Sequence, residues 1–193
     1  PLVAQFLAER GLALSKEKTR IAHIDQGFDF LGFNVRKYNG KLLIKPARSS
    51  IAAVKEKVRT ICKAGGRHTQ SELIRHLNPV IRGWANYYRH VVSSRVFTGI
   101  DFAIWRAIWK WARRRHPQRK PQWVKNRFFA RQDGRDWVFT DRSTSLFRMQ
   151  SLPIRRHVQI RGDANPYDPA NAGYFAQRRS RSVPAPAPSW LAF

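Results

Sequence analysis

The segment that decides the fold spans residues 69–88 and has the sequence TQSELIRHLNPVIRGWANYY. Its first four residues match the capping box, in which Thr69 and Glu72 satisfy each other's free backbone amides, so a helix is expected to begin here. Apolar side chains then recur at helical spacing. Because Pro lacks an amide hydrogen, Asn78-Pro79 predicts a new or kinked helix from that point.

Helices are expected on both sides of this segment. An apolar stripe over residues 51–62 predicts a helix of about four turns, with Ser49 or Ser50 as its amino-terminal cap. A second stripe predicts a helix over about 96–115, and a shorter helix is expected over 121–129. The three helices and the central segment form one predicted bundle.

The amino-terminal part of the chain carries both helix and strand patterns. Residues 2–7 have apolar positions at helical spacing with no cap before them, so we expect the chain to begin inside a helix, as at the cut edge of something larger. Aromatic and branched residues at 28–33 and 41–45 flank Asn39-Gly40, which predicts a two-stranded hairpin with a type I′ turn.

The carboxyl-terminal part is expected to be a small β-rich appendix and then an extended tail. Asp133 and Asp136 flank a glycine and are interpreted as turn formers. Short strand-like stretches follow at 137–139, 146–149 and 154–160. The stretch VPAPAPS at 183–189 predicts a stiff linker or disordered tail.

The fold class predicted from these patterns is mainly α. It comprises an N-terminal helix and β-hairpin, a helical bundle, a small β-rich appendix and an extended tail. The expected domains are residues 1–47, 48–132, 133–168 and 169–193.

The charge balance points to a polyanionic partner. The 193 residues include 37 Lys and Arg against 12 Asp and Glu, a net charge of +25. Such an excess repels itself unless a polyanion neutralises it, and nucleic acid gains binding free energy by releasing counterions. A hydrophobic fraction of 42% with 12 Phe and 7 Trp supplies a real core, so this is expected to be a folded basic protein.

Other classes lack sequence support. No apolar run approaches the roughly 20 residues that a spanning helix needs, and no secretion signal is found, so we expect no membrane partner and a cytoplasmic location. Cys62 is the single cysteine, and neither it nor the six His has ligand partners at metal spacing. We therefore expect no catalytic residue, metal site or cofactor in this chain.

The basic side chains are densest over residues 73–132, which hold fourteen Lys or Arg and a single acid, Asp101. Cations hold phosphates, and the interleaved aromatic rings can stack on unpaired bases. Helical spacing favours core packing for Trp84, Trp105 and Ile108, and leaves core and RNA contact as open alternatives for Tyr87, Tyr88 and Trp109.

Three consecutive arginines, Arg113, Arg114 and Arg115, stand at a predicted helix end, where cations suit the negative end of the helix dipole. They project in different directions, so at least one is expected to reach phosphate. The full set of expected RNA-binding residues is Arg75, Arg82, Asn86, Tyr87, Tyr88, Arg89, Lys110, Arg113, Arg114, Arg115, Lys120 and Lys125.

Four stretches carry a family resemblance. Residues 6–19, FLAERGLALSKEKT, and 27–33, GFDFLGF, are similar to the last palm segments of a group II intron reverse transcriptase. Residues 77–88, LNPVIRGWANYY, and 105–116 resemble the thumb and maturase domain of the same family. The resemblance covers about residues 2–180.

In that family the protein folds its own intron RNA for splicing, and the reverse transcriptase copies the RNA. The resemblance therefore implies group II intron RNA as the partner, with an RNA/DNA template-primer duplex as a possible second one. The residues that match the family's R-G-W-x-N-Y-Y pattern are Arg82, Gly83, Trp84, Asn86, Tyr87 and Tyr88, and Lys110 with Arg113 to Arg115 matches its basic helix end.

The departures from the family pattern matter as well. The polymerase signature Tyr-Ala-Asp-Asp, whose acids bind Mg in the intact polymerase, would precede residue 1, so this chain is not expected to polymerise. Residues 156–168 resemble the stretch leading into a zinc-bearing HNH nuclease that is itself missing, and the sequence after about Arg181 looks unrelated, as a frameshift or truncation would produce.

Three hypotheses follow. The first is an RNA-binding maturase fragment that assists intron folding and splicing. The second is a non-functional remnant of a mobile element. The third is a helical DNA-binding regulator, since two short helices joined at Asn78-Pro79 could imitate a helix-turn-helix.

Overall fold

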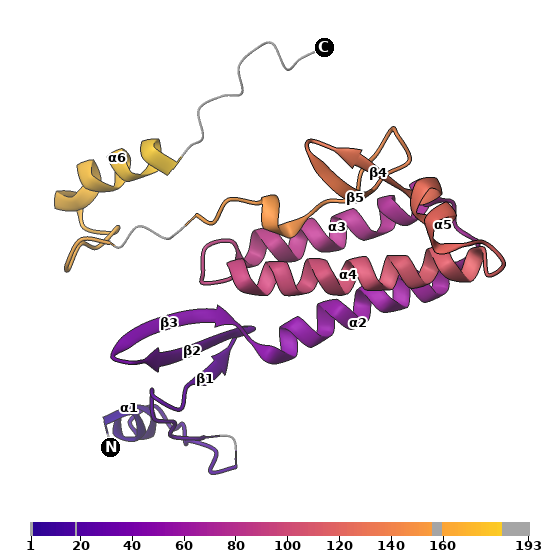
Figure 1. The fold of residues 1–193 in the computed structure, drawn as a ribbon. Coiled ribbons are helices and arrows are strands. Elements are labelled where there is room, and N and C mark those ends of the chain that lie inside the picture. Colours follow the sequence, from indigo (N-terminus) through magenta and orange to yellow (C-terminus); the bar gives the residue numbers. More distant parts are fainter. Residues whose placement is uncertain (1, 18, 156–159, 183–193) are drawn as a thin grey trace. The chain divides into compact units, whose positions relative to one another are not determined.

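The computed structural model describes residues 2–17, 19–155 and 160–182 (Figure 1). The chain divides into two compact units, Pro1–Arg156 and His157–Phe193. The described residues form six α-helices and two small antiparallel sheets, so the predicted mainly α class is confirmed.

The helices are α1 (Leu2–Ala8), α2 (Arg48–Ala64), α3 (Gln70–Tyr88), α4 (Ser94–Arg115), α5 (Pro121–Phe128) and α6 (Ala172–Ser182). The strands are β1 (Phe28–Phe30), β2 (Phe33–Tyr38), β3 (Lys41–Pro46), β4 (Phe129–Gln132) and β5 (Arg135–Phe139).

The core of the larger unit lies among α2, α3 and α4, which Figure 1 shows as neighbouring helices. α2 packs against both of the others. α3 meets α4 where the Trp84 ring lies edge-on to Phe97, with 6.1 Å between ring centroids. Ile108 is fully buried, and Trp84 and Trp105 pack against the buried cluster, as their spacing predicted.

Trp111 joins the three helices to the segment that follows them. Its indole is 1% exposed, and its Nε1 donates a 2.7 Å hydrogen bond to the carbonyl of Gly65, the residue that ends α2. The rings of Phe128 and Phe139 meet the indole edge-on. One side chain of α4 therefore contacts α2's end, α5 and β5.

Capping explains where the first two helices of the bundle begin. The predicted capping box of α3 is confirmed: Glu72 accepts from the Thr69 amide at 2.7 Å, which lowers the pKa of Glu72. α2 begins earlier than expected, with Ala47 rather than Ser49 or Ser50 as its cap. The Ala47 amide donates to the Gly32 carbonyl at 2.8 Å, which holds the chain at a point two or three residues before the predicted caps.

α3 runs without interruption from Gln70 to Tyr88 with Pro79 inside it, so no new helix begins at that proline. Leu77 and Ile81 on either side of the proline are fully buried. Burying both outweighs the roughly 3 kcal/mol that an interior proline costs. The two short helices on which the DNA-binding hypothesis rested are therefore one helix.

The amino-terminal sheet contains one strand more than predicted. The type I′ turn at Asn39-Gly40 is confirmed, since Tyr38 pairs with Lys41 and the two turn residues have φ of 46° and 81°. Residues 28–33 do not form one strand, because a second turn with positive φ at residues 31 and 32 divides them. The sheet order is β1-β2-β3.

The expected β-rich appendix is reduced to one hairpin, β4–β5, which closes through Asp133 in the predicted turn. Asp136 is not a turn former, because it lies in β5 with a carboxylate oxygen 3.9 Å from Arg131. Residues 146–149 are not a strand either. Asn78 explains this: its side chain accepts from the Phe147 amide at 2.8 Å, tying this segment to α3.

The smaller unit contains a helix where a tail was predicted. α6 occupies part of the expected linker over 169–193, with the short 3-10 turn Pro169–Asn171 before it, capped by Asp168. Its Ala, Gln and Arg residues favour helix. The predicted stiff stretch at 183–189 and residues 156–159 of the expected strand 154–160 lie outside the described residues.

Among the helices in the described ranges, none combines the length and the apolar character needed to cross a membrane.

Replacing Trp111 by Phe tests the role of the indole. We expect Trp111→Phe to lower the free energy of unfolding by about 2–4 kcal/mol, because the variant leaves a small cavity and loses the indole hydrogen bond to the Gly65 carbonyl, which keeps the His68 amide as its donor. Urea denaturation measures the change. Trp123→Phe is the matched control, since Trp123 is 37% exposed, and should stay within about 0.5 kcal/mol of wild type. Equal losses in the two variants would contradict the assignment.

Candidate nucleic-acid interface

The amino-terminal group of predicted RNA contacts lies on α3 and just beyond it. Arg75, Arg82 and Asn86 are exposed. The Arg82 guanidinium lies over the Phe147 ring, 4.8 Å from its centroid. Arg89 donates a 3.2 Å hydrogen bond to the side-chain oxygen of Asn86. These polar groups lie at the surface, and intramolecular contacts orient three of the four.

The two tyrosines of this group differ. Tyr88 is 3% exposed and its hydroxyl donates to the Gly32 carbonyl at 3.0 Å, so of the two alternatives the structure places it in the core. Tyr87 is 49% exposed and donates to the Leu31 carbonyl at 3.0 Å, with its ring stacked on Phe33. Both hold the turn between β1 and β2 against α3, which is the role that the Tyr-Tyr pair has in this fold.

The three consecutive arginines at the end of α4 hold neighbouring loops. Arg113 donates to the Arg119 carbonyl at 3.2 Å, and Arg114 to the Cys62 carbonyl in the last turn of α2 at 3.3 Å. Arg115 donates to two carbonyls in the turn that follows α2. Each guanidinium has five donors, so every one of the three keeps donors for an anion while it satisfies a backbone carbonyl.

A basic groove lies between α2 and α4. Arg59 and Lys63 of α2 and Arg106, Lys110 and Arg114 of α4 line a hollow of about 270 Å³. Within each helix these cations are four residues apart, so they project from one side. We call these five residues the α2–α4 groove. It brings together Lys110 and Arg114 of the predicted set with three residues that were not predicted.

The cations of the α2–α4 groove are poorly neutralised by the chain itself. Arg59 forms a 3.2 Å ion pair with Glu56. Within the described residues, no carboxylate lies within ion-pair distance of Lys63, Arg106 or Lys110. Like charges held this close repel one another until an anion enters, so the groove is chemically suited to phosphate.

Cys62 forms part of the groove's lining but has no reactive role. Its side chain is 2% exposed, and burial raises the pKa of the thiol to about 11, although the positive charge of Arg114 acts in the opposite direction. A thiol with so high a pKa stays protonated at neutral pH and is a poor nucleophile and metal ligand. The Cys62 thiol is therefore not a reactive group of the groove at neutral pH.

Helical spacing is the sequence signal for the three groove residues that the predicted set lacks. Arg59 and Lys63 stand four apart, as do Arg106 and Lys110, but which helix faces which cannot be read from spacing alone. The last two cations of the predicted set lie near α5: Lys120 is exposed just before this helix, and the Lys125 ammonium lies 4.8 Å from the centre of the Trp137 ring.

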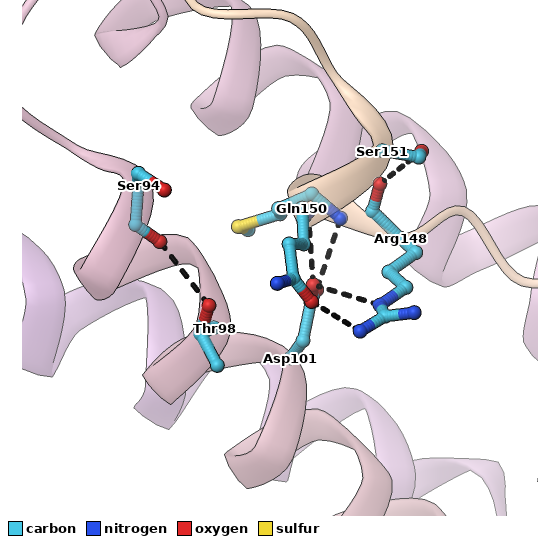
Figure 2. Close-up of polar contacts among 7 residues, drawn as sticks. Ser94, Thr98, Asp101, Arg148, Gln150 and Ser151 are labelled. Carbon is cyan, nitrogen blue, oxygen red and sulfur yellow. Dashed lines mark hydrogen bonds and ion pairs between the residues drawn. The ribbon is translucent and has the colours of Figure 1, made fainter.

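Asp101, the single acid of residues 73–132, is occupied in holding the fold. Its carboxylate accepts from the amides of Met149 and Gln150 at 3.0 and 2.9 Å and lies 3.8 Å from the Arg148 guanidinium (Figure 2). Burial raises its pKa, and the two amides and Arg148 partly offset that effect. The carboxylate thereby clamps the 3-10 turn Met149–Ser151 onto α4 and does not neutralise the exposed cations.

Comparison with known families now identifies this region. Residues 51–129, which span α2 to α5, match the model of the group II intron, maturase-specific domain. The segment is therefore a group II intron maturase portion, as the resemblance predicted. No curated protein matches the chain.

All five cations of the α2–α4 groove lie inside the matched residues, as does Asp101.

The Asp101 clamp can be tested by substitution. Asp101→Ala removes both acceptors, so we expect the free energy of unfolding to fall by about 2–3 kcal/mol, whereas Asp101→Asn keeps one carbonyl acceptor and should lose less. Urea denaturation of the three proteins measures this. A loss in the Asn variant as large as in the Ala variant would contradict the clamp.

The pH dependence supplies a second test of Asp101. The pKa of Asp101 is raised in the folded state, so folding favours the neutral carboxyl. The resulting contribution to the free energy of unfolding is present at low pH and is lost as the pH rises through the folded-state pKa. We therefore expect wild type to gain stability relative to Asp101→Asn as the pH falls. If the stability of wild type relative to Asp101→Asn instead increased with rising pH, the raised pKa of Asp101 would be contradicted.

Proposed function

We propose that the maturase-specific segment binds group II intron RNA through the α2–α4 groove and assists folding and splicing of that intron. The observation that carries the proposal is the convergence of five cations from two helices, with one paired carboxylate, inside the residues that match the family model. The groove holds the RNA backbone, and the exposed cations beyond it extend the contact.

The chemistry of the groove favours a polyphosphate chain over a compact anion. The guanidinium groups present forked donors that match phosphate oxygens, and the two lysines supply point charges between them. Arg75 and Arg82 are exposed on α3 and Lys120 lies before α5, so phosphates that leave the groove find further cations. A long RNA uses many such contacts at once.

In an intact reverse transcriptase, we propose that the same cations also hold the template-primer duplex. Both ligands present a phosphate backbone, and the α2–α4 groove distinguishes neither by base sequence. This second role requires the polymerase part, and it is tested by copying assays with a polymerase domain supplied in trans.

The two other hypotheses make different predictions. A DNA-binding regulator would need a recognition helix, and the continuous α3 removes the helix pair on which that hypothesis depended. Duplex DNA bound as tightly as structured intron RNA at matched salt would revive it. An inactive remnant would bind RNA and leave splicing of a group II intron transcript unstimulated at near-physiological magnesium.

A pair of lysines offers the sharpest test of the groove. Lys63→Ala with Lys110→Ala removes two groove cations that are exposed and outside any ion pair among the described residues, so folding should be unchanged. Filter binding to intron RNA across a salt series measures the effect. We expect affinity to fall about ten- to a hundredfold at 0.1 M salt, and the slope of log K against log salt to decrease by about 2.

The matched control removes two exposed lysines from the sheet instead, Lys37→Ala with Lys41→Ala. Both variants lose the same charge, so a smaller effect in the sheet variant separates the groove from overall basicity. Equal losses in the two double variants would overturn the assignment. These lysines are better targets than Arg113 to Arg115, because the arginines also satisfy backbone carbonyls.

A further inference from the structure

Four aromatic rings line the flank of α4 beside the α2–α4 groove. Phe102, Trp105 and Trp109 follow one another along the helix, with centroids 6.0 and 6.2 Å apart and ring planes within 15° and 5° of parallel. Trp137 of β5 closes the row, 5.7 Å from Trp105 and 5.4 Å from Trp109, with its plane nearly perpendicular to theirs. We call these four residues the aromatic row.

The two ends of the aromatic row are open to solvent. Phe102 is 60% exposed and Trp137 is 37% exposed, whereas Trp105 and Trp109 are partly covered and pack against the core. Large rings left exposed on a folded domain mark interaction surfaces more often than single scattered residues do. Phe102 contacts only one other ring, Trp105, among the ring contacts of the described residues.

The backbone of Trp137 is in a strained conformation. Its φ is +63°, in the left-handed region that bulky side chains rarely occupy. The register of β4–β5 shifts between Ala130 and Gln132, and the Trp137 ring contacts Trp105 and Trp109 of α4. Strain of this kind persists where the surrounding structure enforces it, and it gathers at functional sites.

Cations flank the aromatic row at both of its exposed rings. The Arg106 guanidinium, which lines the α2–α4 groove, lies 5.9 Å from the Phe102 ring centre. The Lys125 ammonium lies 4.8 Å from the centre of the Trp137 ring. Arg106 therefore lines the α2–α4 groove and also flanks the aromatic row. An RNA strand whose phosphates lie in the groove has its bases beside the row.

We infer that the aromatic row stacks on unpaired bases of the RNA whose backbone the α2–α4 groove holds. The inference rests on the proposed function and adds to it the class of RNA bound: single-stranded or looped nucleotides next to the phosphate contacts. Aromatic side chains stack on the flat faces of bases, and in duplex RNA these faces are already covered by neighbouring base pairs. Cations beside the aromatic side chains neutralise the phosphates.

Packing alone explains only part of the aromatic row. Trp105, Trp109 and Trp137 hold the β4–β5 hairpin to α4 through edge-to-face contacts, and Trp109 also meets Phe129. Phe102 adds nothing to that attachment, because it touches neither strand of the hairpin in the described ring contacts. Its ring is the part of the row that can be removed without loosening the fold.

Two RNA probes of equal length and charge test the inference: a twelve-nucleotide oligouridylate and its abasic counterpart. We expect wild type to bind the oligouridylate about tenfold more tightly than the abasic strand. Phe102→Ala should reduce oligouridylate binding to near the abasic level and leave abasic binding unchanged, and Phe102→Tyr should restore it. Phe30→Ala is the matched control, since Phe30 is 62% exposed on β1.

Each other outcome identifies what has failed. If wild type binds both strands equally and Phe102→Ala changes neither, the stacking inference is overturned while the proposed function stands. If Phe102→Ala weakens both strands by the same factor, or Phe30→Ala has the same effect, base stacking at this position is also overturned. If wild type binds neither strand nor intron RNA, the proposed function fails together with it.

Discussion

The hydrogen bond from the Trp111 indole to the Gly65 carbonyl fixes where α4 meets the end of α2. The indole is buried, so leaving its N–H unpaired would cost more than the bond itself contributes. Lys110 directly precedes Trp111 on α4 and Arg114 follows about one turn later, and both line the groove with residues of α2. The same contact that completes the core therefore also sets the position of these groove cations relative to α2.

Basic residues in this protein serve two purposes that are usually separate. Arg114 donates to a carbonyl in the last turn of α2, and Arg115 donates to carbonyls in the turn that follows. These guanidinium groups therefore satisfy carbonyls that have no partner within the helix. Arg106 and Lys110, in contrast, have no carboxylate partner among the described residues. Counting positive charges cannot separate these roles; their hydrogen-bond partners can.

Local signals in the sequence predicted local structure well. The capping box at Thr69 and the type I′ turn at Asn39-Gly40 are both confirmed, because each depends on residues within four positions. Pro79 misled the prediction of helix boundaries, since the burial of its neighbours across the bundle outweighs the local cost of an interior proline.

The interface was less predictable than the fold. The sequence identifies the basic helix end and the RNA-related family pattern, yet half of that pattern's tyrosine pair proves to be core, with Tyr88 buried against Gly32. The α2–α4 groove joins Arg59 to Arg106, residues 47 positions apart, and only tertiary packing brings them together. The role of Asp101 was hidden for the same reason, because its partners lie near residue 149.

Photocrosslinking tests the central claim most directly. A group II intron transcript carrying 4-thiouridine would be crosslinked to the chain, and the attached peptides mapped by mass spectrometry. We expect the crosslinks to concentrate on α4 between residues 99 and 115, which lines the groove, and on β5, which carries Trp137 of the aromatic row. Crosslinks confined to the sheet of β1, β2 and β3, or to the unit His157–Phe193, would contradict the account.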